Sequence, residues 1–172
     1  EIDTRDWSSD VCSSDLISVG TGNDWIRMYG IPTKYSAAVR AIKEGYTFLQ
    51  DVAEVEYEES LYRQKRYMAN VAGVGFDAAV IKRTLQSNAK GYLGAWGYMW
   101  CLVRTFFKHK STGIKLWVDD RLVFNGLLFS IAIGVGRYNG GGIQQLPTAV
   151  ADDGLLDVTM IRPVHWWHVV FR

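Results

Sequence analysis

The amino-acid sequence predicts an α+β protein, in which a short α/β portion precedes a mostly antiparallel β domain with inserted helices. Three observations lead to this fold class. Ile17–Val19 has the apolar character of a strand end and leads through a glycine turn into a helical segment. Residues 48–71 largely alternate apolar and polar side chains, as half-buried antiparallel strands do. Two helical patterns then precede a hairpin and a last strand, so helices and antiparallel strands follow each other in blocks.

The α/β portion contains two predicted helices. The segment DWIRMYG forms a short helix that Gly30 ends, because glycine readily adopts the left-handed conformation that closes a helix. A second helix is predicted over Thr33–Glu44, where apolar residues recur at helical spacing and Gly45 follows as the stop. We place a domain boundary near this point, with the α/β portion at residues 17–46 and a β-rich second domain at residues 47–172.

The second domain combines helices with strands of different burial. Helices are predicted over Phe76–Asn88 and Gly91–Phe107 from apolar residues at helical spacing. Ile114–Val118 and Leu122–Val135 form a hairpin through an Asp-Asp turn, and the second strand is apolar enough to be buried on both faces. Leu155–Ile161 is the last predicted strand.

Composition and cysteine content narrow the class of protein. The 172 residues are 48% hydrophobic and 22% charged, which is typical of a globular protein, and the formal charge of +1 predicts no nucleic-acid partner. Cys12 and Cys101 have no Cys or His at ligand spacing, so we expect neither a disulfide framework nor a zinc site, and a reducing cytoplasmic setting. The apolar stretches are shorter than the roughly 20 residues of a spanning helix, so we expect peripheral membrane contact at most.

Residues 1–16 do not fit the pattern of the rest of the chain. The string DWSSDVCSSDL repeats Ser-Ser-Asp, lacks apolar periodicity and switches abruptly to Ile17-Ser18-Val19. It resembles the translation of a sequencing adapter, and we therefore interpret it as a non-native segment outside the fold. The alternative is a genuine, disordered Ser/Asp-rich tail.

A glycine-rich turn, Gly20-Thr21-Gly22-Asn23-Asp24, separates the predicted strand end from the first helix. Glycines let a backbone approach a nucleotide, and the free N–H groups at the start of a helix bind phosphate. The same residues also suit a structural role, with the glycines forming the turn and Asn23 or Asp24 capping the helix. Taken alone, the five residues favour the structural role.

A long loop with two adjacent carboxylates is the second candidate site. Residues 139–158 read NGGGIQQLPTAVADDGLLDV, and Asp152 and Asp153 precede a glycine within this loop. A hard cation such as Mg²⁺ binds carboxylate and main-chain carbonyl oxygens, which a tight Asp-Asp-Gly turn can supply together. A plain Asp-Gly hairpin turn is an equal alternative.

Four motifs occur in the order seen in bacterial diacylglycerol kinase-like lipid kinases. They are GTGNDW at 20–25, NVAGVGFDAAV at 70–80, YNGGGIQQLP at 138–147 and ADDGLLDV at 151–158. The chain from Ile17 onward resembles this family. The resemblance implies the C-terminal remnant of an α/β nucleotide-binding domain followed by a mostly antiparallel β-sandwich with inserted helices. It also implies an enzyme that transfers the ATP γ-phosphate to a hydroxyl of diacylglycerol or a related lipid, with Mg²⁺, at the inner face of the membrane.

The resemblance also implies site residues. The nucleotide contacts lie in the glycine-rich turn, at Gly20, Thr21, Gly22 and Asn23. Thr21 is the expected direct contact with ATP, and the glycines shape the approach of the backbone. A structural metal ion is held by the Asp153 carboxylate together with the main-chain carbonyls of Val150 and Leu155.

Two parts of the family pattern do not occur in the sequence. These are a Gly-Gly-Asp-Gly-Thr loop that wraps the nucleotide phosphates and an Asp-Gly-Glu motif whose Asp is the general base. Phosphoryl transfer depends on positioning and on neutralising the phosphates, with a carboxylate beside the attacking hydroxyl. We therefore expect an inactive internal piece of the enzyme and assign no catalytic residue within it.

Two other functions stay open. A kinase for a soluble substrate, such as an NAD kinase, shares the architecture, although the glycine triplet joined to ADDGLLD favours the lipid branch. A noncatalytic nucleotide-binding or membrane-associated module is the alternative outside the enzymes.

Three further features have a structural interpretation at this stage. Asp77 suits a helix cap better than a place facing the lipid cleft, and the same holds for Asp24. The aromatic helix, with Trp100 and Phe107 on one side and Lys108 and Lys110 at its end, is expected to be buried rather than interfacial. The histidines near the C-terminus, His165 and His168, are expected to be surface or packing residues.

Overall fold

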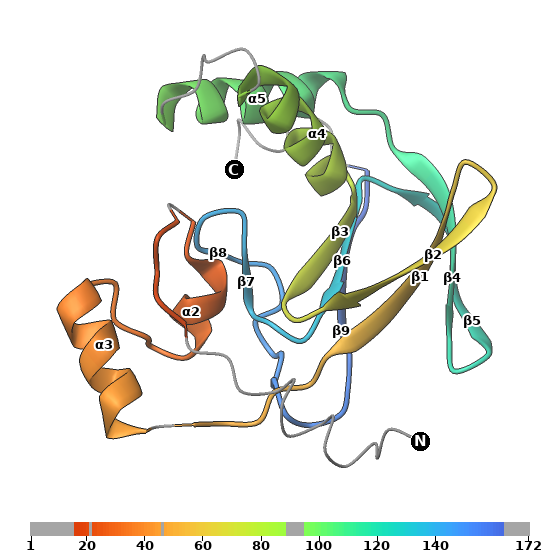
Figure 1. Cartoon of the computed structure of the whole chain (residues 1–172). Coiled ribbons are helices and arrows are strands. Elements are labelled where there is room, and N and C mark those ends of the chain that lie inside the picture. Colours follow the sequence, from red (N-terminus) through yellow and green to blue (C-terminus); the bar gives the residue numbers. More distant parts are fainter. Residues whose placement is uncertain (1–15, 21, 46, 89–94, 164–172) are drawn as a thin grey trace. The chain divides into compact units, whose positions relative to one another are not determined.

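The computed structural model describes residues 16–20, 22–45, 47–88 and 95–163. These residues form two compact units. One contains the described residues up to Val71 together with Gly134–Asp157, and the other contains Ala72–Ile133 together with the residues from Val158. Helices and mostly antiparallel strands occur together, so the predicted α+β class is confirmed (Figure 1).

The first unit begins with two helices that end at the predicted glycines. Helix α2 spans Asp24–Met28, and Gly30 follows with a φ of 64°. Helix α3 spans Tyr35–Glu44, and its C-cap Gly45 is left-handed with a φ of 71°. Both helices were predicted, but Ile17–Val19 lies outside every strand of the described chain. A strand requires a neighbouring strand to pair with, which an apolar run alone does not provide.

A two-stranded antiparallel ribbon follows in the same unit. Strand β1 spans Ala53–Glu59 and pairs with β2, Tyr62–Met68, in a register that runs from Ala53 opposite Met68 to Glu59 opposite Tyr62. The alternating pattern predicted strand structure from residue 48, but the observed strand begins five residues later, at Ala53. The segment before β1 is irregular because Asp51 bonds to the distant loop around Ala151 instead of joining a strand ladder.

The second unit contains a three-stranded sheet in the order β3, β6, β9. Strand β3 spans Val71–Gly75, β6 spans Ser130–Gly134 and β9 spans Asp157–Ile161. Four of the five β6 residues are buried, so the middle strand forms much of the core of this unit. The chain passes from β3 directly into helix α4, Phe76–Asn88, whose predicted bounds are confirmed (Figure 1).

The predicted long strand from Leu122 to Val135 is divided at Phe129. Its first part is β5, Arg121–Leu128, which pairs antiparallel with β4, Thr112–Val118. The Phe129 N–H donates to the Ile161 carbonyl at 2.8 Å, and its own carbonyl accepts the Phe76 N–H at 3.1 Å. The chain therefore leaves the hairpin at Phe129 and enters the sheet. Burial on both faces was expected for the whole strand and is wrong for β5, which is mostly exposed.

Helix α5 spans Ala95–Lys108 and packs against α4. An aromatic cluster beneath it joins Phe76, Phe106, Phe129 and His109, and the Phe76 and Phe129 rings stack with centroids 4.8 Å apart. The opposite side of α5 is exposed, with Trp100 and Phe107 each 65% accessible, so the expectation of a buried helix is wrong for that side. Among the described residues, no helix is long and apolar enough to cross a membrane.

The first unit is completed by a small hairpin and a buried loop. Strand β7, Tyr138–Asn139, pairs antiparallel with β8, Ile143–Gln144, around the glycine triplet. The core of this unit gathers small and aliphatic side chains from helices and loops: Ile26, Ala38, Val135, Leu146, Ala149 and Ala151. Half of these side chains belong to the loop after β8, and Val150 and Ala151 of this loop line the same pocket as Met28 of α2.

Candidate functional site

The carboxylate of Asp24 joins two glycine-rich segments that are far apart in the sequence. Its Oδ2 accepts a hydrogen bond from the Gly141 N–H at 2.8 Å, and its Oδ1 accepts one from the Gly142 N–H at 2.5 Å. Charge-assisted hydrogen bonds to a carboxylate are stronger than those between neutral groups. The turn at Gly20–Asp24 and the triplet at Gly140–Gly142 therefore form one structural element.

The glycine triplet needs its glycines for conformational reasons. The φ angles of Gly140, Gly141 and Gly142 are 68°, 88° and 102°, a region that residues with a Cβ rarely adopt. A Cβ on Gly142 would also lie 3.2 Å from Cζ of Arg27, a guanidinium that donates to the Gly22 carbonyl at 3.4 Å. Arg27 therefore lies between the two glycine-rich segments and places a positive charge beside both.

The glycines of the first turn are different, because packing against the described residues does not require them. A Cβ on Gly20 would meet Asn23 Oδ1 at 3.4 Å, and one on Gly22 would meet Asp24 Oδ2 at 3.5 Å, both ordinary contacts. Neither glycine is among the residues with a positive φ. The described surroundings would therefore tolerate a Cβ at either position.

The expectation that Asn23 or Asp24 caps helix α2 through its side chain is wrong. Asn23 is the N-cap, with φ 53° and ψ 32°, but its side chain makes no capping hydrogen bond. Asp24 is the first helical residue, and its two oxygens bind the glycine triplet instead. Two aligned N–H donors from the triplet attract the carboxylate more strongly than one local N–H group does.

The side chain of Gln50 connects α2 to the end of β2. Its Oε1 accepts hydrogen bonds from Trp25 Nε1 at 2.7 Å and from the Tyr29 hydroxyl at 2.5 Å. Its Nε2 donates to the Ala69 carbonyl. The amide therefore uses both its acceptor and its donor to hold a helix of only five residues in place.

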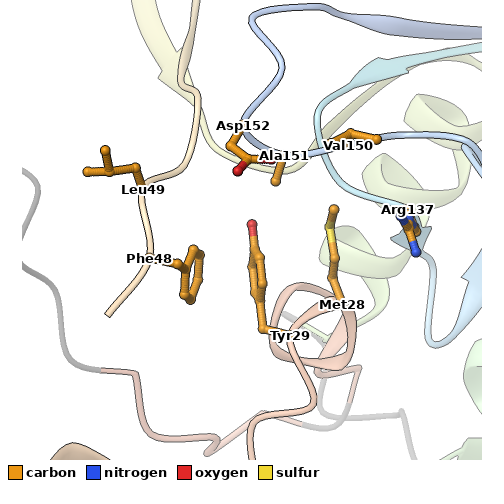
Figure 2. A pocket seen from close by; sticks show the side chains of 8 residues that line it. All are labelled: Met28, Tyr29, Phe48, Leu49, Arg137, Val150, Ala151 and Asp152. Carbon is orange, nitrogen blue, oxygen red and sulfur yellow. The ribbon is translucent and has the colours of Figure 1, made fainter. Parts of the chain in front are cut away.

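Beside Tyr29 the first unit contains an open pocket of 240 Å³ (Figure 2). The Tyr29 ring stands in its middle, with its hydroxyl directed toward the Ala151–Asp152 segment and Phe48 stacked on one side at a centroid distance of 4.0 Å. The lining mixes apolar side chains with one guanidinium and one carboxylate: Met28, Tyr29, Phe48, Leu49, Arg137, Val150, Ala151 and Asp152.

Burial raises the pKa of the Tyr29 phenol above its ordinary value of 10.0. The Trp25 side chain opposes this shift, whereas the negative charges of Asp152 and Asp51 add to it. The phenol is therefore neutral throughout the physiological pH range, and it donates its proton to Gln50 Oε1.

The loop predicted to hold a metal is fixed by Asp51. The Asp51 N–H donates to the Ala151 carbonyl at 2.7 Å, and its Oδ2 accepts the Gly154 N–H, also at 2.7 Å. Asp153 Oδ1 accepts the Leu155 N–H at 2.9 Å. Two carboxylates thus accept hydrogen bonds from the same short stretch of backbone and fix its shape.

Comparison with known proteins places the chain in a family. The family described as the YegS C-terminal NAD kinase beta sandwich-like domain matches residues 70–171, which is more than half of the chain. The chain belongs to the diacylglycerol kinase-like, YegS-type lipid kinase family. The predicted family resemblance is thereby confirmed.

Two curated relatives are similar to most of this chain. A "Probable lipid kinase YegS-like" protein of Pseudomonas syringae pv. syringae is 32% identical over 149 residues, which are 87% of this chain and 45% of that protein. A "Diacylglycerol kinase" of Mycobacterium tuberculosis is 29% identical over 86% of this chain and 46% of its own length. The chain thus spans about half the length of the curated relatives that it matches.

The fold is also that of a solved diacylglycerol kinase structure. The crystal structure of a diacylglycerol kinase from Bacillus anthracis matches with a TM-score of 0.54 at 18% sequence identity, over 90% of this chain and 47% of that one. At this level of identity the similarity establishes the fold.

The predicted site residues remain predictions, but the structure shows the surroundings of most of them. Thr21, the expected ATP contact, lies outside the described residues, as do His165 and His168. Gly20 is exposed, and Gly22 and Asn23 are half-buried. Val150, Asp153 and Leu155 are all exposed on one loop. Within the described chain no group of three or more His, Cys, Asp or Glu side chains is close enough to hold a metal, but the predicted set has one carboxylate and two carbonyls.

Sequence reasoning missed several residues that organise the candidate site. Gln50 and Asp51 were assigned to a strand, although two adjacent polar residues between Leu49 and Val52 interrupt the alternation there. Asn70, at the start of the second motif, accepts the N–H groups of Val135 and Gly136 on its carbonyl at 3.0 and 3.2 Å. Its signal was its place in the motif, but no local pattern indicates a partner more than sixty residues away.

Proposed function

We propose that the protein to which these residues belong is an ATP-dependent lipid kinase that phosphorylates a hydroxyl of diacylglycerol or a related lipid. Family membership and the printed names of the relatives support a lipid kinase. The structural observation that supports this assignment is the contact between Asp24 and the glycine triplet, because it joins two of the four motifs into one site.

In this proposal Gly20, Thr21, Gly22 and Asn23 line the approach of the nucleotide. Packing against the described neighbours does not account for Gly20 and Gly22, so the approach of a nucleotide to this backbone is a reason for glycine at both positions. Arg27 contributes a positive charge next to both glycine-rich segments, and phosphoryl transfer depends largely on neutralising phosphate oxygens.

A divalent cation, Mg²⁺, belongs to the loop that Asp51 fixes. We assign it to the Asp153 carboxylate and the main-chain carbonyls of Val150 and Leu155. A cation at this place would fix the shape of the loop, because its oxygen ligands come from residues before and after Gly154. The role of Asp51 is then to position the backbone that supplies those oxygens.

A phosphorylation assay with two acceptors tests the proposed substrate class. The complete open reading frame that encodes these residues is expressed and incubated with radiolabelled ATP and Mg²⁺, with diacylglycerol micelles in one arm and NAD in the other. Label is expected in the lipid and not in NAD. Label in NAD alone indicates a soluble-substrate kinase, and label in neither acceptor supports a noncatalytic nucleotide-binding module.

The 172-residue chain alone is expected to give no lipid phosphorylation in the same assay. Neither Gly-Gly-Asp-Gly-Thr nor Asp-Gly-Glu occurs in its sequence, so a phosphate-wrapping loop and a general base of the family type are both lacking. Labelled lipid above a no-protein control would show that other residues perform these roles.

A further inference from the structure

The glycine triplet presents two neighbouring backbone N–H groups to a single carboxylate. The N–H groups of Gly141 and Gly142 converge on the two oxygens of Asp24, at 2.8 and 2.5 Å. The φ angles of 88° and 102° give the backbone this shape, which glycine adopts far more readily than other residues. Successive N–H groups that converge in this way form a concave anion site, called a nest, which also occurs in phosphate-binding loops. In this protein the anion in the nest is a carboxylate of the same chain.

Arg27 places a positive charge beside the nest. Its Cζ is 3.2 Å from the place that a Cβ on Gly142 would take, and its side chain is exposed. It donates to the Gly22 carbonyl at 3.4 Å, which is a long hydrogen bond. Within the described chain, no ion pair involves Arg27. A guanidinium therefore lies next to an anion site without pairing with the carboxylate that now fills it.

A phosphate group matches these donors better than the carboxylate does. Both Asp24 oxygens are used by the two glycine N–H groups, so neither is directed at Arg27. A phosphate monoester has three terminal oxygens that accept hydrogen bonds and carries about two negative charges at neutral pH. It can therefore bond to both N–H groups and to the guanidinium at once. Arginine is especially suited to this contact, because its planar group offers parallel N–H donors to phosphate oxygens.

The exchange of the carboxylate for a phosphate requires little movement. The bond from Gly141 to Asp24 is exposed to solvent, and the bond from Gly142 is only partly buried. Asp24 is the first residue of helix α2, so rotation of its side chain to another staggered position withdraws the carboxylate without unfolding the helix. The nest is therefore accessible from solvent in the folded protein.

We propose that the nest and the Arg27 guanidinium form a phosphate-binding site, which the Asp24 carboxylate occupies when no phosphate is bound. The carboxylate is an internal competitor with a high effective concentration, so free phosphate binds weakly while Asp24 is present. A phosphate that the rest of its own molecule holds nearby overcomes this competition for the same reason. Nucleotides and phosphorylated lipids both carry such a group. The inference concerns phosphate recognition and does not depend on kinase activity.

Removal of the competing carboxylate tests the site. Inorganic phosphate is titrated into the parent chain and into Asp24→Ala, with EDTA present and with sodium chloride of equal ionic strength as the reference. Asp24→Ala should bind phosphate about tenfold more tightly than the parent or better, and phosphate should raise its unfolding temperature more than chloride does. With ¹⁵N-labelled glycine, the amide signals of Gly141 and Gly142 should move during the titration. Asp24→Asn, which removes the charge but keeps one acceptor oxygen, gives the same comparison if Asp24→Ala does not fold.

Asp51→Ala is the matched control, because Asp51 is another carboxylate of the same unit that accepts a backbone N–H, from Gly154. Phosphate should stabilise this control no more than chloride does. Adding Arg27→Gln to Asp24→Ala should weaken phosphate binding by about tenfold or more, since a hydrogen bond to a charged group is lost. Equal stabilisation of the control, equal affinity of the parent and the Asp24 variants, or no effect of Arg27→Gln overturns the proposal.

Two larger ligands identify the source of the phosphate. ADP and dioctanoyl phosphatidic acid, each with a terminal phosphate, are titrated into Asp24→Ala under the same conditions. Tighter binding of ADP than of inorganic phosphate assigns the site to a nucleotide, and tighter binding of the lipid assigns it to a phosphorylated lipid. Either result supports the site. A complete reading frame that phosphorylates neither acceptor would refute the proposed kinase activity and leave these titrations unaffected.

Discussion

Asp51 holds the backbone of Gly154 through its carboxylate and that of Ala151 through its N–H, both at 2.7 Å. The two bonds join segments that are 100 and 103 positions apart in the sequence. The predicted metal ligands belong to the same stretch of chain: Val150 and Leu155 flank these two contacts, and Asp153 lies between them. The geometry of the loop therefore depends on a residue that is not itself in the predicted ligand set.

Replacing Asp51 by Ala should destabilise the first unit by about 1–3 kcal/mol, the usual cost of removing a charged hydrogen-bond acceptor. Urea unfolding followed by circular dichroism measures this difference. Glu58→Gln on β1 is the control, because it changes an exposed carboxylate of the neighbouring ribbon. An Asp51→Ala midpoint equal to that of the control would mean that the Asp51 carboxylate contributes nothing to stability.

Gly142→Ala should destabilise the chain by roughly 1–3 kcal/mol, since alanine is strained at a φ of 102° and its Cβ would crowd Arg27. Gly113→Ala is the matched control, because an added Cβ there meets nothing within 4 Å and φ is ordinary. It should be neutral or slightly stabilising. Thermal unfolding of the two single variants decides between conformational strain and a general intolerance of alanine.

Adding Mg²⁺ should raise the unfolding temperature of the parent chain, because a ligand that binds only the folded state stabilises it by mass action. Asp153→Asn should abolish this shift, and Asp152→Asn should retain it, since the neighbouring carboxylate is not in the predicted ligand set. A titration with Mg²⁺ in a thermal unfolding experiment compares the three proteins. The assignment is wrong if the two variants respond alike.

The Tyr29 phenol should ionise above pH 10.0, its ordinary pKa, because burial and the charges of Asp152 and Asp51 favour the neutral form. The folded state then holds its proton more tightly than the unfolded state does. This contribution to stability is complete below the unfolded pKa and is lost as the pH rises through the folded pKa.

The ultraviolet difference titration between the parent and Tyr29→Phe isolates this one phenol. Its midpoint should lie above 10.0. Asp152→Asn should move the midpoint back toward the ordinary value, whereas Glu58→Gln should leave it unchanged. A midpoint at or below 10.0 in the folded parent would contradict the effect of burial.

Local sequence signals predicted the helices well, because the features that define a helix lie within a few residues. The stop at Gly45 and the bounds of Phe76–Asn88 follow from glycine conformation and apolar spacing. The strands were harder to delimit. Nothing in the run from Leu122 to Val135 shows that Phe129 exchanges one strand partner for another, since both its hydrogen-bond partners are distant in sequence.

The candidate site was predicted in its parts and not in its assembly. The glycine-rich turn and the glycine triplet were both recognised as motifs, but the bond between Asp24 and Gly142 joins residues 118 positions apart. Helix capping was the best local use of Asp24, and a tertiary contact replaced it. Likewise, the exposed side of α5 has the apolar spacing of a buried helix, so periodicity could not distinguish a buried face from an exposed apolar face.

The hydrogen bonds of the Gln50 side-chain amide determine which parts of the first unit should unfold together. Helix α2 has only five residues, which are too few to form a stable helix alone. Trp25 and Tyr29 both donate to the Gln50 side-chain oxygen, and the Gln50 side-chain nitrogen donates to the Ala69 carbonyl. The helix and the end of β2 should therefore unfold as a single cooperative unit. Their amide protons should then exchange with solvent at one common free energy of opening. The Gly141 and Gly142 amide protons should share this free energy, because they are bonded to Asp24 of the same helix.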